Sequence, residues 1–177
     1  MEILKIFRQL ISEGQKNKKE LLTMRKLSKI SFDSLEWMNV DEENSSQIFY
    51  DLGFRTVNEV LNIRMFDLFN LQDVDNNRAE EFLVTVFKFL YPNKTIDHNI
   101  YYSEKEQEPF YKNWSKKHPE FETVKVRDVL VQDDLEVGTM LCIFDYVTQA
   151  FYNSSEYNNR KYRYMSYSAL KKKRGTF

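Results

Sequence analysis

The stretch from Phe49 to Leu90, FYDLGFRTVNEVLNIRMFDLFNLQDVDNNRAEEFLVTVFKFL, decides the expected fold of this 177-residue chain. A helix is predicted to end at Gly53, because glycine often follows the last turn of a helix. The sequence Thr56-Val57-Asn58-Glu59 is a capping box, in which the threonine hydroxyl and the glutamate carboxylate each accept a backbone N–H. It predicts a short helix, which a second short helix and a polar turn follow.

The end of this stretch, residues 77–91, has the strongest helical periodicity in the chain. Apolar side chains recur there at spacings of three and four residues, which place them on one helix face. They are Ala79, Phe82, Leu83, Val86, Phe87 and Leu90. Asp75 or Asn76 can cap this helix, because either side-chain oxygen can accept a backbone N–H of the first turn. Pro92 follows its end.

The rest of the chain is also expected to be mainly helical, and its four glycines and three prolines suit that class. Helices are predicted over residues 2–13, 16–27, 105–118, 134–153 and 155–174, with a short strand or the lead into a helical turn at 123–127. The buried face of the 134–153 helix should include Val137, Met140, Leu141, Phe144, Val147 and Phe151. We expect a mainly α helical bundle with an N-terminal helical pair (1–40), a central domain (41–92) and a C-terminal helical region (93–177).

The cysteine content and the apolar runs indicate a cellular compartment. Cys142 is the one cysteine and lies in the apolar sequence MLCIFDYV, which favours a buried thiol in a reducing compartment. The start, MEILKIF, does not resemble a signal peptide. No apolar run approaches the roughly 20 residues that a membrane helix needs. A soluble, cytoplasmic protein is therefore expected.

The net charge of −1 conceals an uneven distribution. Residues 1–40 carry a net charge of +3 and residues 154–177 carry +6, whereas residues 41–104 carry −7 and residues 105–153 carry −3. A phosphate backbone would be contacted at the basic ends. The central helical module is the most acidic block, which argues against strong DNA binding by that module alone.

The order of helices over residues 44–90 resembles a helix-hairpin-helix domain, in particular the C-terminal domain of the bacterial RNA polymerase alpha subunit. Members of that family contact phosphates and the minor groove through the first helix and the hairpin. An ungapped alignment places the family's hairpin glycine on Asp75. The lysine and serine after it fall on Asn77 and Arg78, and the arginine and asparagine of the first helix fall on Asn44 and Gln47.

The resemblance implies a retained fold with changed contact residues. A backbone that presses its N–H groups onto a phosphate needs glycine, and the carboxylate of Asp75 would repel that phosphate. Only Arg78 keeps a basic group at the hairpin. The alternatives are DNA binding by this hairpin, or its use as a protein-docking or purely structural module, with Asp73, Asp75 and Asn77 as candidate partner-binding residues.

The last predicted helix is the better candidate for nucleic-acid binding, because basic side chains alternate there with tyrosines. Cations bind phosphates, and tyrosine rings either stack on bases or pack beneath the charges. With Arg78, the candidate nucleic-acid-binding residues are Arg160, Lys161, Arg163, Lys171, Lys172, Lys173 and Arg174. The alternative is a solvated amphipathic helix with a basic tail.

Catalytic, cofactor and metal sites are not expected. His98 and His118 lie far apart and have no cysteine cluster beside them. The polar turn at residues 73–77 lacks the glycine and the terminal glutamate of a calcium loop. Four glycines leave little scope for a phosphate-binding loop. We therefore predict a protein that is not an enzyme.

Two hypotheses for function follow. In the first, a non-enzymatic interaction protein docks on a DNA-associated complex, such as a transcription complex, with its acidic centre on protein and its basic ends on nucleic acid. In the second, a phage or mobile-element inhibitor, anti-CRISPR-like or anti-restriction-like, blocks a nucleic-acid-targeting enzyme with an acidic surface. The sequence motivates the second through the acidic central block and the replaced contact residues.

Overall fold

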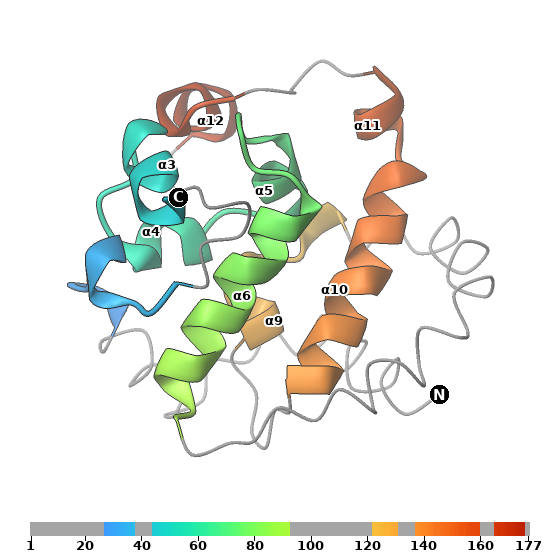
Figure 1. Ribbon diagram of the computed structural model, residues 1–177. Helices are drawn as coiled ribbons and strands as arrows, with labels where there is room; N and C mark the ends of the chain where they lie inside the picture. The colour runs from blue at the N-terminus through green and yellow to red at the C-terminus, as the bar shows by residue number, and fades with distance from the viewer. Residues whose placement is uncertain (1–26, 38–43, 93–121, 131–136, 160–164, 176–177) are drawn as a thin grey trace.

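The computed structural model describes residues 27–37, 44–92, 122–130, 137–159 and 165–175, which form a mainly helical fold (Figure 1). In chain order, the elements are the 3-10 helix η1 (Phe32–Ser34) and the α-helices α3 (Ser45–Asp51), α4 (Val57–Leu61), α5 (Met65–Asn70), α6 (Asn76–Leu90), α9 (Val126–Leu130), α10 (Val137–Tyr152), α11 (Ser155–Asn159) and α12 (Tyr167–Arg174). Within these ranges, extended pairing is limited to two isolated bridges. The prediction of a mainly α protein is confirmed.

Helix α3 ends at Asp51, and Gly53 terminates it, as predicted. The Gly53 N–H donates to the Tyr50 carbonyl at 3.0 Å and the Phe54 N–H donates to the Phe49 carbonyl at 3.2 Å. These two bonds form a Schellman motif, which satisfies carbonyls that the helix itself leaves without donors. Gly53 has a φ of 105°, a backbone conformation that residues with a Cβ rarely adopt.

Replacing Gly53 with alanine should lower the free energy of unfolding by about 1–2 kcal/mol, because a Cβ strains a backbone with positive φ. The space itself is adequate, since an added Cβ would lie 3.5 Å from the Tyr167 Cβ. Urea unfolding followed by circular dichroism measures the change. Gly175→Ala is a companion variant. Gly175 has a φ of 77°, and an added Cβ there would have no atom within 4 Å, so this variant measures the cost of the backbone strain alone.

The capping box at the start of α4 is confirmed. The Thr56 N–H donates to the Glu59 carboxylate at 2.9 Å, and the Arg55 N–H donates to the same oxygen at 2.7 Å. Helix α6 begins as predicted at Asp75, whose carboxylate accepts the Arg78 N–H at 2.8 Å. The carboxylates of Glu59 and Asp75 thus satisfy backbone donors that have no partner within the helix.

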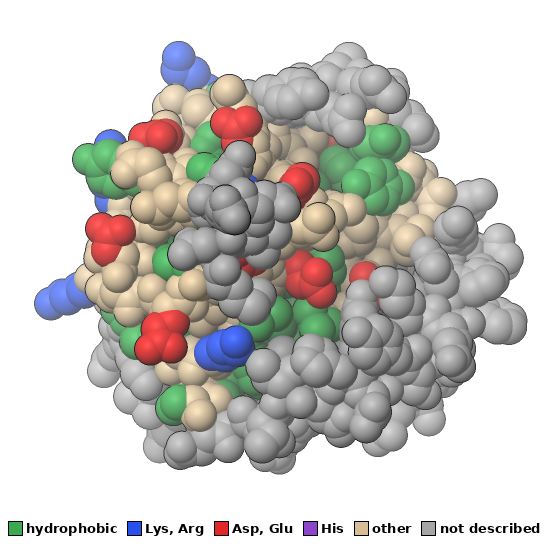
Figure 2. All heavy atoms as spheres, viewed as in Figure 1, with side chains coloured by type: hydrophobic (Ala, Val, Ile, Leu, Met, Phe, Trp, Pro, Cys, Tyr) green, Lys and Arg blue, Asp and Glu red, His purple; other side chains and the backbone are tan. Residues whose placement is uncertain are grey.

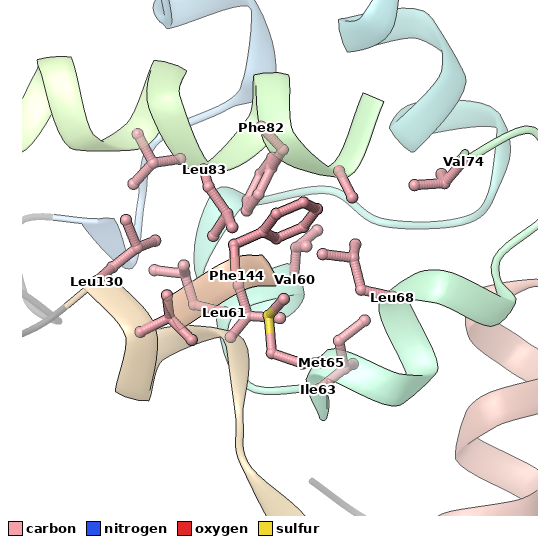
Figure 3. Close-up of a cluster of buried hydrophobic side chains, with 14 of the residues drawn as sticks. Val60, Leu61, Ile63, Met65, Leu68, Val74, Phe82, Leu83, Leu130 and Phe144 are labelled. Atoms are coloured by element: carbon pink, nitrogen blue, oxygen red, sulfur yellow. The ribbon is translucent and has the colours of Figure 1, made fainter. Parts of the chain in front are cut away.

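One hydrophobic core joins the three predicted segments of the chain. Its buried side chains come from the region of η1, from all of α3 to α6, and from α9, α10 and α12. Figure 3 shows the part where side chains of α4, α5, α6, α9 and α10 meet, including Leu61, Phe82 and Phe144. Helix α10 packs against α5, α6 and α9. The central module therefore shares its core with the C-terminal region.

The predicted apolar faces of the two longest described helices are confirmed. In α6, five of the named residues are buried and Leu90 is half-buried. In α10, the buried positions among those named are Met140, Leu141, Phe144, Val147 and Phe151. The side chain of Val137 lies outside the described part.

The prediction of a single helix over residues 155–174 is wrong. The chain forms α11 and α12 instead, and between them Met165 is extended and pairs with the segment that leaves α5. The Met165 N–H donates to the Asn70 carbonyl at 2.9 Å, and the Gln72 N–H donates to the Met165 carbonyl at 3.1 Å. These bonds to a distant segment replace the helical bonds that Met165 would otherwise make.

The segment at residues 123–127 was predicted as a short strand or as the lead into a helical turn, and the described structure has the second, with one isolated bridge before the helix. Lys125 pairs with Arg64 in an isolated antiparallel bridge, and α9 begins at the next residue. The helices predicted over residues 2–13 and 105–118 lie outside the described residues. The helix predicted over 16–27 also lies outside them, except for Leu27 at its end, which is buried in the core.

Candidate functional site

Helix α12 lies against the turn between α3 and α4. The Tyr167 N–H donates to the Leu52 carbonyl at 2.8 Å, and the Tyr167 ring stacks on Phe54 with 4.3 Å between centroids. Burial raises the pKa of Tyr167, and the charge and hydrogen bond of Glu59 raise it further. Leu170, one turn later, is fully buried. These contacts hold α12 as a fixed part of the fold.

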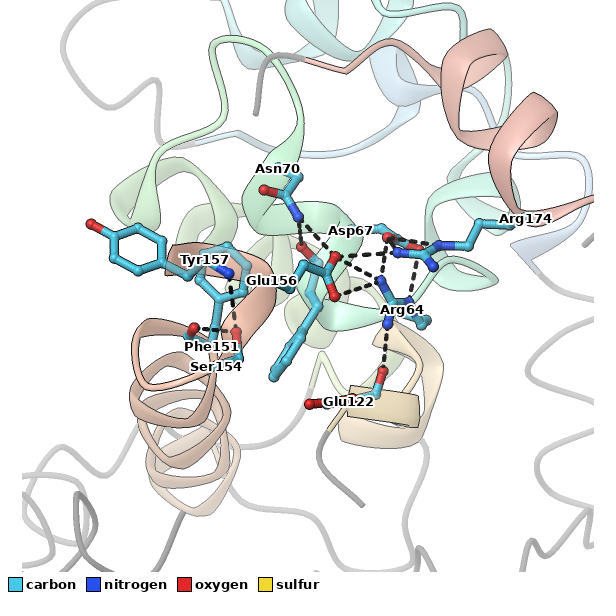
Figure 4. A network of polar contacts seen from close by, with 10 residues as sticks. Arg64, Asp67, Asn70, Glu122, Phe151, Ser154, Glu156, Tyr157 and Arg174 are labelled. Carbon is cyan, nitrogen blue, oxygen red and sulfur yellow. Dashed lines mark hydrogen bonds and ion pairs between the residues drawn. The ribbon is translucent and has the colours of Figure 1, made fainter. Parts of the chain in front are cut away.

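Four charged side chains, Arg64, Asp67, Glu156 and Arg174, form an ion cluster that also holds α12 (Figure 4). Asp67 lies at its centre with 1% of its side chain exposed. Its carboxylate accepts from Arg64 at 2.8 Å and from Arg174 at 2.9 Å. Because both arginines share one buried carboxylate, the start of α5 and the end of α12 are tied together.

Glu156 of α11 is the second carboxylate of the ion cluster. It accepts from Arg64 at 2.9 Å and from Arg174 at 3.2 Å, and the Asn70 amide donates to it at 3.2 Å. Burial alone would lower the pKa of Arg64, but the hydrogen bonds and charges of Asp67 and Glu156 outweigh burial and raise it. The guanidinium therefore stays protonated, and the two carboxylates balance the two arginines.

The predicted nucleic-acid-binding residues have different positions in the structure. Lys171, Lys172 and Lys173 are exposed on α12, and the Lys171 ammonium lies 4.1 Å from the centroid of the Tyr167 ring. Arg174 belongs to the ion cluster and is half-buried, so its main contacts are internal. Arg160, Lys161 and Arg163 lie outside the described residues.

The prediction that Arg78 contacts nucleic acid is contradicted by its burial. Its side chain is 4% exposed, and its guanidinium donates to the Ser45 hydroxyl at 2.6 Å. Ser45 in turn donates to the buried carboxylate of Glu81. Arg78 therefore ties α6 to α3 from inside the protein, and its guanidinium does not face solvent.

The predicted partner-binding residues lie at the turn between α5 and α6 and in the first turn of α6. Asp73, Asp75 and Asn77 are all exposed. Asp73 has a φ of 63°, the left-handed conformation that a hairpin glycine adopts readily. Asp75, the position aligned with that glycine, has a φ of −82°. Aspartate tolerates the left-handed region better than most residues do.

An exposed tyrosine that sequence reasoning missed lies beside this turn. The Asn76 amide donates to the Tyr152 hydroxyl at 2.8 Å, and Tyr152 keeps 37% of its surface exposed. The two residues are 76 positions apart, so no local pattern signals their contact. The turn and the end of α10 therefore form one surface with two carboxylates and an aromatic ring.

A second exposed tyrosine, Tyr50, was also missed. It is 52% exposed, and the Arg55 guanidinium carbon lies 4.1 Å from the centroid of its ring. Tyr50 interrupts the apolar pattern of α3, and an arginine follows five residues later, beyond the helix-ending glycine. This combination is the local signal from which the pair could have been found.

Metal binding and membrane insertion find no support in the described ranges. They contain no group of three or more histidine, cysteine, aspartate or glutamate side chains arranged to hold a metal ion. None of their helices has the length and apolar character that crossing a bilayer requires.

A scan against known protein families, a search of curated proteins and a search of solved structures each found no match to the chain.

Proposed function

We propose that the chain is a non-enzymatic interaction protein that docks on a DNA-associated complex, such as a transcription complex. The helix-hairpin-helix-like module, residues 41–92, is the scaffold of this proposal. The lysines of α12 contact nucleic-acid phosphates, and the acidic turn with Asp73 and Asp75 contacts a protein of the complex.

The observation that carries this proposal is the display of three consecutive exposed lysines, Lys171, Lys172 and Lys173, on a helix that the core holds in place. A lysine on a mobile tail loses side-chain and backbone freedom when it binds, and that entropy weakens binding. Because Tyr167 and Arg174 are anchored at the two ends of α12, the backbone between them is already ordered. The burial of Arg78 leaves the turn itself acidic, which favours a protein partner there.

Nucleic-acid binding through α12 predicts a measurable dependence on salt. Each phosphate that a lysine neutralises contributes about 0.9 to the slope of log affinity against log salt concentration for duplex DNA. Replacing Lys171 and Lys172 with glutamine should therefore make that slope less steep by about 1.8. Fluorescence anisotropy with labelled duplex DNA, repeated over a range of salt concentrations, measures the slope.

Lys29 and Lys88 provide a control of matched charge, because both are exposed lysines on other parts of the fold. Their double replacement with glutamine changes the net charge equally and should leave the slope unchanged. Equal slopes for the two double variants would contradict a specific role for α12. Failure of the full-length protein to retain DNA at low salt would remove the nucleic-acid half of the proposal.

A second candidate function is a phage or mobile-element inhibitor of a nucleic-acid-targeting enzyme. The exposure of Asp73 and Asp75, together with the burial of Arg78, favours it, because carboxylates can occupy a basic channel that otherwise holds phosphates. The two functions differ in a competition assay. An inhibitor binds the enzyme in competition with DNA and binds no DNA itself, whereas the docking protein binds both together.

A further inference from the structure

The exposed aromatic ring of Tyr50 has features of a base-stacking surface. Tyr50 is the most exposed large hydrophobic side chain among the described residues, at 52%. Single-stranded nucleic acids bind proteins by stacking their bases on aromatic rings and by placing their phosphates on cations. A solvent-facing tyrosine with a cation beside it meets both requirements.

The guanidinium of Arg55 is a cation held in a fixed position beside Tyr50. It donates to the Tyr50 carbonyl and to the Phe54 carbonyl, each at 3.0 Å, and these bonds place it over the Tyr50 ring. A planar guanidinium can stack on a base as a ring does, and it also carries charge for a phosphate. The pair is therefore ordered before any ligand arrives.

Lys171 of α12 is connected to this pair through Tyr167. Tyr167 contacts the backbone of Leu52 and the ring of Phe54, so the first turn of α12 covers the chain between Tyr50 and Arg55. Lys171 then lies over Tyr167. In Figure 2, lysine and arginine side chains project from the upper left of the molecule, where Figure 1 places α12, α3 and α4.

The carboxylates of this region are engaged by protein donors. Glu59 accepts the backbone N–H groups of Arg55 and Thr56, and Asp51 accepts the Gln47 amide at 2.8 Å. The exposed cations of the surface are Arg55 and the three α12 lysines. These four cations outnumber the carboxylates of Asp51 and Glu59, so the local balance is basic, although the central segment as a whole is acidic.

We propose that this surface, defined by Tyr50, Arg55 and Lys171 to Lys173, binds single-stranded nucleic acid. A base stacks on Tyr50 beside Arg55, and the strand continues over α12 with its phosphates at the lysines. The inference rests on the proposed nucleic-acid role of α12 and adds the strand class and the stacking residue. Duplex DNA offers no unstacked base to Tyr50, so the surface distinguishes the two forms.

The test uses the full-length protein and fluorescence anisotropy at low salt. The probes are a labelled oligothymidylate of about 16 nucleotides, within the site size of single-strand-binding folds, and a duplex of the same length. The Tyr50→Ala variant should bind the single strand about 5- to 150-fold more weakly, because stacking of one base has that effect. Its affinity for the duplex and its salt slope should not change.

Two further variants keep the result interpretable. Tyr50→Phe keeps the ring and should retain binding, whereas Tyr50→Leu keeps apolar bulk without an aromatic face and should lose it. Tyr152→Ala is the matched control, since Tyr152 is the other exposed tyrosine of the described residues and lies beside the acidic turn. Its affinity for both probes should equal that of the wild-type protein.

The outcomes separate this inference from the proposed function. Equal affinities of the wild-type protein and Tyr50→Ala for the single strand would overturn the inference, and would leave the salt-dependent role of α12 intact. If the wild-type protein binds neither probe, the inference and the nucleic-acid half of the proposed function both fail. Capture of a protein partner through Tyr50 without any binding of the single strand would also overturn the inference.

Discussion

Replacing Phe49 with alanine should lower the free energy of unfolding by about 3–5 kcal/mol, the range found when a buried phenylalanine is truncated. Phe49 is fully buried, and within the described part of the chain its ring has four aromatic neighbours. The ring centroids of Phe32, Trp37, Phe54 and Phe82 lie 5.4, 6.1, 6.3 and 5.1 Å from that of Phe49. Alanine would leave a cavity among these rings, which come from the η1 region, the turn after α3 and helix α6.

Urea unfolding followed by circular dichroism tests this expectation, with two companion variants. Phe49→Leu keeps most of the volume and should cost less than alanine does. Tyr50→Ala changes the next residue, which is largely exposed, and surface changes of this kind usually stay within about 0.5 kcal/mol. Similar unfolding midpoints for Phe49→Ala and Tyr50→Ala would contradict the central place of Phe49 in the core.

Replacing Asp67 with asparagine should lower the free energy of unfolding by about 3 kcal/mol, the lower end of the range for breaking a buried ion pair. The carboxylate accepts from both Arg64 and Arg174, and its removal leaves two guanidinium groups with one carboxylate, Glu156. The lower end applies because the arginine side chains keep 19% and 25% of their surface exposed, so water partly screens them.

Asp73→Asn is the matched control for this substitution, because Asp73 is exposed and asparagine also tolerates its positive φ. A double-mutant cycle with Arg174→Met isolates the contact between α5 and α12. The cost of Asp67→Asn should be smaller in the Arg174→Met background, since one of the two arginines is already gone. Equal costs in both backgrounds would show that Arg174 does not depend on Asp67.

Local signals predicted the central helices well. The capping box of Thr56 and Glu59, the termination at Gly53 and the periodicity of α6 depend on residues within a few positions of each other, and each lies where the sequence placed it. Such patterns are readable because a helix satisfies its own backbone and shows its buried face at a fixed spacing.

The features that the sequence did not reveal depend on distant contacts. Residues 155–174 carry a helical pattern, but Met165 bonds to Asn70 and Gln72 and so interrupts it. The ion cluster joins Asp67 to Arg174 across 107 positions, which no local pattern encodes. Arg78 was predicted to bind nucleic acid because the alignment placed it at the hairpin. That alignment carries no information about whether the side chain is buried beneath α3.

The attachment of α12 to the core links ligand binding to thermal stability. Tyr167, Leu170 and Arg174 bind the rest of the fold, while the lysines between them face solvent. A molecule that binds the lysines of folded α12 therefore binds the native state in preference to the unfolded chain. At a concentration of 100 times its Kd, such a molecule adds about 2.7 kcal/mol to the stability of the whole domain. The melting temperature of the protein thus serves as an indicator of ligands whose identity is not known in advance.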